Sequence, residues 1–386
     1  MNKGLTALAM GTFALGISEF LMMGILSKLA ADMDITVSKA GSFISAYASG
    51  VCCVAPLLLF ARKLKLKNIM LSLACVISAG NLLASLAPGY WTFFAARFIS
   101  GLPHGAYFGV GAIVARRLAK PGEEVSAVSI MISGMTVATL LGVPLATFIT
   151  NALTWRIAFV IVAVAGAATA IAIKCWVPQV AGLPDMGFKG QFKFLGTLPP
   201  WLIFGGVIFG QIGFYCWYSY IDPQLVDVAG FSTSDLSWLM VLAGLGMFAG
   251  NLIAGRFADH YKPSAVAATV EGLGIPVMVL FYFLCPYKPA AVVLMMLGTA
   301  ILFGSGSPLQ SSIVGYSRGG EMLGAACIQI AYNAGNAIAA WIGGTVIARG
   351  YGYTAPAIAG LPLILIGTTL LYVLYRKYER GQRGEG

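Results

Sequence analysis

Three ionisable residues stand in long runs that otherwise carry almost no charge, and their types suit proton transfer. Glu19 lies in the stretch GISEFLMMG, while Arg97 and His104 share the apolar run 92–114. A buried carboxylate is costly to keep ionised, so an acid there can bind and release a proton. Arginine keeps its charge and needs a partner, and histidine titrates near neutral pH. We expect proton coupling at these residues, with Arg97 or His104 as the partner of Glu19; a purely structural ion pair or hydrogen bond is the alternative.

Other reactive residue types do not form a recognisable catalytic or metal-binding pattern. Ser100 precedes His104 by one helical turn, but no third orienting acid follows from the sequence, and there is no HExxH motif or triad arrangement of the GxSxG kind. The chain has two histidines, and its seven cysteines show no CxxC spacing. The sequence therefore predicts no enzyme activity, no metal, no cofactor and reduced thiols.

The composition places these residues in a membrane. Of the 386 residues, 59% are hydrophobic and 10% are charged, against about 25% charged residues in soluble domains. The apolar runs are long enough to cross a bilayer, and they are predicted as helices because backbone groups in lipid must be satisfied internally. The first run carries a carboxylate and lacks a cleavage site, which favours a retained span over a signal peptide. The twelve expected spans are 4–26, 40–60, 68–87, 92–114, 126–148, 157–176, 201–221, 236–255, 265–284, 290–314, 323–347 and 355–375.

The distribution of basic residues predicts the orientation of these spans. Twelve spans place both termini on one side, and that side collects eighteen of the 24 Lys and Arg residues, against five on the other side. Basic residues favour the cytoplasmic side of a membrane. We therefore expect both termini in the cytoplasm, and we interpret the basic surplus as a topology signal instead of a nucleic-acid surface.

The chain divides into two halves that resemble each other. The longest polar interval, 177–200, separates a predicted six-helix bundle at 1–176 from a second at 201–386, which ends in a short cytoplasmic tail. Three pairs of stretches match at offsets between 197 and 201 residues: GMTVATLLG with GNAIAAWIGG, AKPGEEVSAVSI with YSRGGEMLGAACI, and FARKLK with FADHYK. We therefore predict an all-α integral membrane fold of twelve transmembrane helices in two parallel six-helix pseudo-repeats, joined by a cytoplasmic linker.

Several stretches together resemble the major facilitator superfamily over nearly the whole chain. They are GTFALGISEFLMMGIL, ARFISGLPHGAYFGVGA, SGMTVATLLGVPLATF, TWRIAF and GGEMLGAACIQIAYNAGNAIAAWIGG. Within the superfamily the sequence looks like the twelve-span drug/proton antiporter group, most closely the AraJ-type arabinose efflux permeases. The resemblance implies the major facilitator fold and transport of a small molecule by alternating access.

Two family motifs lie inside membrane spans. The motif R-x-x-x-G-x-x-x-G is matched by Arg97 and the glycines four and eight residues later, and in the family it is linked to proton transfer. The antiporter motif of the fifth span is matched by Gly134, Gly142 and Pro144, which in the family bend the helix and allow tight packing. Small residues at such spacing also serve ordinary helix packing, which is the alternative interpretation.

A third family motif, roughly G-x-L-A-D-R-x-G-R-K, connects the second and third spans of each half. The second half keeps Gly255, Ala258 and Asp259, and the resemblance gives Asp259 a role in latching helix ends during gating. The first half has Arg62 in place of the aspartate, so the resemblance gives the latch role to Asp259 only and leaves open whether the first-half loop still gates. The basic residues at 62–67 suit anionic lipid headgroups equally well.

The resemblance also implies a central cavity lined by spans one, four, seven and ten. In the first span, Thr12, Gly16 and Met23 share a helical face with Glu19. Glu271 is near a predicted cytoplasmic helix end and is expected to reach the interface by snorkelling. Spans four, seven and ten, together with a polar stripe in span eleven, supply the remaining cavity candidates, which are Tyr107, Gln211, Tyr215, Gln310, Tyr332, Asn333 and Asn336.

These observations predict a monomeric secondary transporter of the bacterial inner membrane, in contact with lipid. The expected activity is export of a sugar, sugar derivative, metabolite or drug by proton-coupled antiport, with protons and the small molecule as its partners. Proton-coupled symport for uptake is the alternative within transport. A non-transporting membrane sensor is the alternative from another class, although the polar segments leave little room for a signalling domain.

Overall fold

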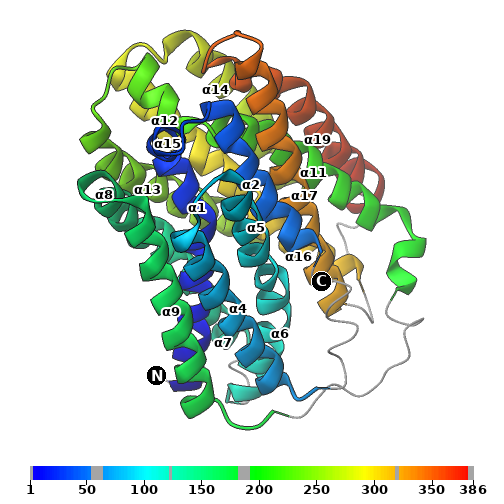
Figure 1. The fold of residues 1–386 in the computed structure, drawn as a ribbon. Coiled ribbons are helices and arrows are strands. Elements are labelled where there is room, and N and C mark those ends of the chain that lie inside the picture. The colour runs from blue at the N-terminus through cyan, green and yellow to red at the C-terminus, as the bar shows by residue number, and fades with distance from the viewer. Residues whose placement is uncertain (1–2, 54–63, 121–123, 181–191, 318–320, 381–386) are drawn as a thin grey trace. The chain divides into compact units, whose positions relative to one another are not determined.

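The computed structural model describes residues 3–53, 64–120, 124–180, 192–317 and 321–380. Within these ranges the chain is helical and contains no strand (Figure 1). The chain divides into two compact units. Unit 1 consists of 1–36 and 42–186, and unit 2 consists of 37–41 and 187–386. The loop position Arg62 and residues 181–191 of the expected linker lie outside the described residues.

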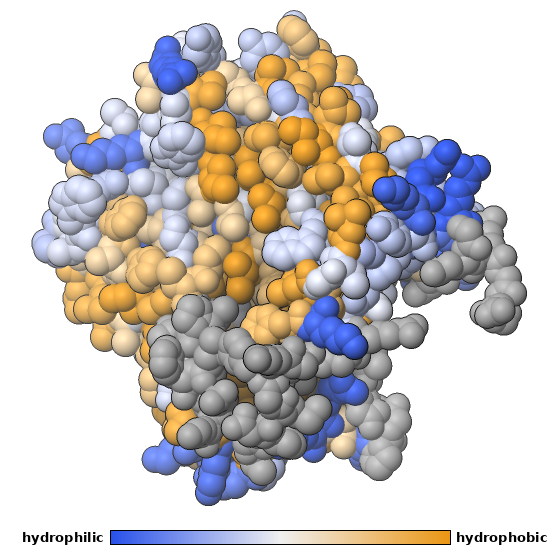
Figure 2. Space-filling view, turned by 90° about the vertical axis from the view of Figure 1, so that its right-hand side faces the viewer, coloured by the Kyte–Doolittle hydropathy of each residue, from blue (hydrophilic) through white to orange (hydrophobic). Residues whose placement is uncertain are grey.

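Ten helical segments of the described chain are long and apolar enough to cross a membrane. They correspond to ten of the twelve expected spans. The other two are 40–60, which runs beyond the described residues, and 323–347, which lies within a long helix that is not among the ten. Many large apolar side chains are exposed, among them Leu83, Val164 and Phe283, and Figure 2 shows one broad hydrophobic face with hydrophilic residues at its margins. Such surfaces suit contact with lipid.

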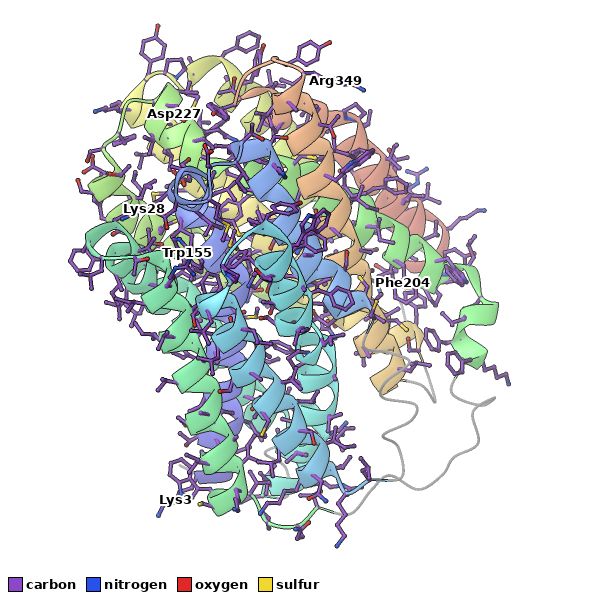
Figure 3. The ribbon with its side chains drawn as sticks, viewed as in Figure 1. Lys3, Lys28, Trp155, Phe204, Asp227 and Arg349 are labelled. Carbon is purple, nitrogen blue, oxygen red and sulfur yellow. The ribbon has the colours of Figure 1, made fainter. Side chains whose placement is uncertain are left out.

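Unit 1 is built around its first helix, α1. This helix contacts α4, α6, α7, α8 and α9, and all its residues from 14 to 26 are buried. Figure 3 shows Lys3 at one end of this unit and Lys28 with Trp155 towards the other. A polar side chain in the middle of α1 therefore faces neighbouring helices instead of lipid. The elements of this unit are α1 (Lys3–Asp32), α2 (Val37–Cys52), α4 (Leu66–Leu86), α5 (Tyr90–Gly101), α6 (Pro103–Leu118), α7 (Glu124–Val137), η1 (Ala138–Gly142), α8 (Val143–Ala152) and α9 (Trp155–Trp176).

Two membrane segments of unit 1 are interrupted helices. The expected fourth span is divided into α5 and α6 at Leu102, directly before Pro103, which has no N–H to donate to the preceding turn. The fifth contains the π-helical turn η1, directly before the turn that carries Pro144. Such interruptions are common at functional sites.

Unit 2 has α11 at its centre, packed against α17 and α19, while α14 packs against α19 and α15. In this unit a helix is interrupted at Ser305, which separates α15 from α16. Figure 3 shows Asp227 and Arg349 at one end of this unit and Phe204 away from them. Its elements are η2 (Lys193–Gly196), α11 (Leu198–Tyr218), α12 (Ile221–Pro223), η3 (Gln224–Val228), η4 (Thr233–Asp235), α13 (Leu236–His260), α14 (Pro263–Leu284), α15 (Lys288–Gly304), α16 (Gly306–Tyr316), α17 (Glu321–Ala348), α18 (Ala355–Ala359), α19 (Leu361–Leu374) and η5 (Tyr375–Glu379).

Candidate functional site

Glu19 and His104 approach each other inside unit 1. The Nε2 atom of His104 lies 3.8 Å from Oε2 of Glu19. His104 is 2% exposed and Glu19 is 8% exposed. This separation is longer than a hydrogen bond and within the range of an ion pair. Because α6 begins at Pro103, His104 belongs to its first turn, where the interruption of the helix directs it towards α1. The structure thus brings together two of the three residues expected to handle protons.

Tyr47 of α2 connects His104 to the third of these residues. Its hydroxyl lies 2.9 Å from Nδ1 of His104, so the imidazole has a carboxylate on one side and a phenol on the other. The guanidinium carbon of Arg97 lies 4.5 Å from the centroid of the same tyrosine ring, a distance typical of a cation–π interaction. Sequence reasoning missed Tyr47, because nothing in the run 40–60 shows which neighbour its hydroxyl would meet.

Arg97 is fully buried and hydrogen-bonds the residue that precedes Glu19. Its Nη1 donates a hydrogen bond of 2.8 Å to the backbone carbonyl of Ser18, and its charge interacts with that of Glu19. Within the described chain, Nε and Nη2 have no hydrogen-bond partner. Such unsatisfied donors are costly in a buried site. They are therefore available to any acceptor that moves towards them.

A polar chain continues from Arg97 across α1 to α4. Ser18 Oγ donates a hydrogen bond of 3.0 Å to Oδ1 of Asn81, and Nδ2 of Asn81 donates to the carbonyl of Ile77. Asn81 is fully buried. An amide in an apolar run is a signal that sequence reasoning could have used, because such side chains are rarely exposed to lipid.

The other candidates on α1 and α6 take part in helix contacts. Thr12 Oγ1 donates to the carbonyl of Met131 in α7, and a Cβ added at Gly16 would lie 2.7 Å from the Cβ of Ala138. Met23 is fully buried. Tyr107 donates a 3.3 Å hydrogen bond from its hydroxyl to the carbonyl of Leu8 and belongs to the apolar core of unit 1. Thr12 and Gly16 were expected to line a cavity from α1. The structure places both against α7.

The antiporter-motif residues form the other side of this contact. A Cβ at Gly134 would lie 2.0 Å from the carbonyl oxygen of Ala9, and one at Gly142 would lie 2.6 Å from side-chain carbons of Ile17. Pro144 lies in the first turn of α8, directly after the π-helical turn. The motif therefore brings a bent helix into backbone contact with the helix that carries Glu19.

The candidates in unit 2 are mostly buried polar residues. Gln211 and Tyr215 lie on α11. A Cβ added at Gly335 of α17 would lie 2.6 Å from the Cβ of Gln211. Asn333 and Asn336 of α17 are 2% and 4% exposed, and Asn333 Nδ2 donates to the carbonyl of Gln329. Tyr332 and Gln310 are partly buried. Unit 2 therefore holds several of the expected polar side chains in its interior, and the hydrogen bond of Asn333 stays within its own helix.

The sequence profile of the Major Facilitator Superfamily matches residues 8–326. The chain belongs to this superfamily. It is 38% identical over 382 residues to "Putative transporter AraJ" of Escherichia coli K12, a match that covers 98% of this chain and 97% of that protein. It is 26% identical to "Probable sugar efflux transporter" of Helicobacter pylori, over 71% of each chain. The crystal structure of a bacterial homologue of the human lysosomal transporter Spinster, at 15% identity, superposes with a TM-score of 0.77, covering 99% of this chain and 98% of that one. The chain is therefore a multi-pass membrane transporter and not an enzyme.

The structure describes part of the third family motif, which contains Gly255 and Asp259. Gly255 lies in α13, where an added Cβ would be 3.9 Å from Cβ of Ser307 in α16. Ser307 Oγ in turn donates a 2.9 Å hydrogen bond to Oδ1 of Asn251, one turn before Gly255. The backbone of Asp259 lies in α13, and its side chain lies outside the described part of the chain. The described contacts thus connect the glycine of the motif to the interrupted α15–α16 segment.

Proposed function

We propose that the transporter exports a small molecule by proton-coupled antiport with alternating access, and that Glu19 carries the proton. The supporting observation is the cluster of Glu19, His104, Tyr47 and Arg97 in unit 1. It combines a buried carboxyl, a titratable imidazole within ion-pair distance and a cation with unused N–H groups. Intramembrane ionisable residues of this kind commonly mark proton pathways.

The geometry suggests how the proton could be coupled to a conformational change. With its proton bound, Glu19 is neutral and the N–H groups Nε and Nη2 of Arg97 have no acceptor among the described residues. Loss of the proton creates a carboxylate that attracts Arg97, and the guanidinium can satisfy it with two parallel hydrogen bonds. The two protonation states therefore favour different positions of α1 relative to α5. His104, held by Tyr47, would accept the proton from Glu19 or return it.

The architecture that we propose has twelve transmembrane helices in two parallel six-helix halves. The interruptions at Leu102 and Ser305 support it, because each divides a membrane segment and their offset is close to that of the matching sequence stretches. The halves are 1–176 and 201–386, joined by a cytoplasmic linker at 177–200. Both termini lie in the cytoplasm, as the distribution of basic residues indicates.

The proposed substrate is a sugar, sugar derivative, metabolite or drug, bound by polar residues of the membrane spans. The sugar efflux named for the Helicobacter relative supports a sugar and an outward direction. Gly255 and Asp259 would latch helix ends during gating, and the transporter would act as a monomer in contact with lipid. The proposed cavity residues are Thr12, Gly16, Met23, Tyr107, Gln211, Tyr215, Gln310, Tyr332, Asn333 and Asn336.

The proposal can be tested with proteoliposomes loaded with radiolabelled arabinose, and in parallel with ethidium as a drug-like probe. For an antiporter, an acidic external medium accelerates loss of the probe from the vesicles. For a symporter, the same gradient retards its loss and accelerates uptake. Flux of both probes that ignores the gradient would exclude proton coupling.

The variant Glu19→Gln separates the role of Glu19 from that of the rest of the protein. It mimics the protonated carboxyl and keeps its shape. We expect it to lose gradient-driven flux while retaining the thermal stability of the wild-type protein. A variant that still responds to the gradient as the wild type does would show that the proton is carried elsewhere.

A further inference from the structure

A second buried carboxyl, that of Glu271, lies in unit 2 and has no part in the mechanism described above. The sequence suggested that this side chain would reach the membrane interface. In the structure it is 1% exposed and turns inward from α14. A Cβ added at Gly210 of α11 would lie 2.7 Å from Oε1, and one at Gly367 of α19 would lie 3.2 Å from Oε2. Glu271 therefore occupies a space that two glycines leave open.

The same glycines bring α11 and α19 into backbone contact. A Cβ at Gly367 would lie 2.8 Å from the amide nitrogen of Gly210 and 2.9 Å from the carbonyl oxygen of Gly206. The carboxyl thus sits where three helices meet. A movement of any of these helices would change the surroundings of Glu271, because glycine backbones form the contact between α11 and α19 directly.

The surroundings of Glu271 offer little to a negative charge. Oε2 has no hydrogen-bond partner in the described chain, and no ion pair to Glu271 occurs there. A titratable group that interacts with Glu271 is Tyr332 of α17, whose buried hydroxyl is likewise unpartnered within the described ranges. An unpaired buried carboxylate costs several kcal/mol, so the neutral acid is the form that fits this site.

Other titratable groups face Glu271 only from a distance. Tyr372 lies near the C-terminal end of α19 and Tyr375 begins η5, where Arg376 donates to the hydroxyl of Tyr372. At the start of α14, two turns before Glu271, Ser264 donates a hydrogen bond to Glu379 of η5. The described parts of α13, α15, α16 and α18 place no charged side chain in interaction with it.

A cavity of about 340 Å³ lies between α14 and the segment formed by α19 and η5, beside residues that neighbour Glu271, which does not itself line it. Its walls carry five hydroxyl groups, which belong to Thr269, Thr368, Thr369, Tyr372 and Tyr375. Thr368 follows Gly367 directly, and its Cγ2 lies 3.5 Å from a Cβ added at Gly272, the residue after Glu271. The Thr368 hydroxyl is buried and has no partner among the residues described.

We propose that Glu271 is a proton-binding site of unit 2, supplied through this cavity. Water in the cavity delivers a proton to the carboxylate, where a new O–H bond forms and the charge is lost. Release reverses the step, with the hydroxyl groups of Thr368 and Tyr372 on α19 marking the path. The site is separate from the proton role proposed for Glu19, and either can fail without the other.

The test uses the wild-type protein in lipid nanodiscs and a hydrophobic carbodiimide, which modifies protonated carboxyls in apolar surroundings. Mass spectrometry of the peptide that contains Glu271 reports the extent of labelling. We expect labelling at low pH that falls by about tenfold per pH unit once the proton is lost. The variant Ala268→Leu fills the cavity and should reduce labelling several-fold, while Leu273→Ala, on the exposed side of α14, should not.

Infrared difference spectra provide the second measurement. On alkaline titration, the wild type should lose a carbonyl band of a protonated carboxylic acid that Glu271→Gln lacks and Glu19→Gln retains. Absence of labelling at every pH, or labelling independent of pH, would overturn the proposal. So would an acid band that persists unchanged in Glu271→Gln. Flux in Glu19→Gln tests the proposal for Glu19, whereas labelling and the infrared band test the proposal for Glu271. Failure of one proposal is therefore distinguished from failure of the other.

Discussion

The hydroxyl of Tyr47 lies 2.9 Å from Nδ1 of His104, while the ring of the same tyrosine lies under the guanidinium of Arg97 at 4.5 Å. One side chain therefore holds the imidazole through its polar end and the cation through its ring. Because Glu19 is within ion-pair distance of that imidazole, the position of Tyr47 determines how the other three residues meet.

Tyr47→Phe should separate these two contacts. The variant keeps the ring beneath Arg97 and removes the hydroxyl, so the buried Nδ1 of His104 loses a partner at a cost of about 1–3 kcal/mol. We expect a lower unfolding temperature and weakened gradient-driven flux. Tyr47→Leu, which removes the ring as well, should be more severe. Equal behaviour of the two variants would show that the ring contributes nothing beyond the hydroxyl, and wild-type behaviour of Tyr47→Phe would show that the hydroxyl contributes nothing.

The sequence predicted the helical segments well, because a run of apolar residues without charge has few alternatives in a membrane. It also identified Glu19, Arg97 and His104 as a group. It could not identify Tyr47 or Asn81 as their neighbours, since the rotation of α2 and α4 about their own axes depends on packing with other helices. Thr12 and Glu19 share a helical face, yet the structure uses Thr12 to bond α7. Helical spacing alone does not distinguish a face that lines a cavity from one that touches a helix.

Gly134→Ala should push α7 away from α1. The new Cβ would lie 2.0 Å from the carbonyl oxygen of Ala9, so the backbone must shift. Overpacking of this kind costs about 1–3 kcal/mol, and thermal unfolding in detergent can measure it. Gly109→Ala is the matched control, because an added Cβ there meets nothing within 4 Å. Helix propensity predicts that the control is neutral or more stable, by at most about 1 kcal/mol. Equal destabilisation by both substitutions would contradict the role of Gly134 in close packing.

Pro103→Ala should restore the missing N–H and favour a continuous helix from α5 into α6. His104 would then leave its position beside Glu19, so we expect gradient-driven flux to fall. Thermal stability should stay the same or increase, because an interior proline is unfavourable in a helix. Flux and unfolding temperature measured on the same preparation separate this outcome from simple misfolding. Full proton-driven flux in the variant would mean that the interruption is not needed to position His104.

A double-mutant cycle on Glu19 and His104 measures whether their 3.8 Å approach carries energy. The single variants Glu19→Gln and His104→Gln each remove one ionisable partner, and the double variant removes both. Contacting residues commonly show coupling of about 0.5–3 kcal/mol, whereas independent residues are additive. We expect coupling of that size in the free energy of unfolding when the three variants are compared with the wild type at the same pH. Additive effects at every pH would mean that the two residues only lie near each other, and Arg97 would then be the group to which the charge of Glu19 responds.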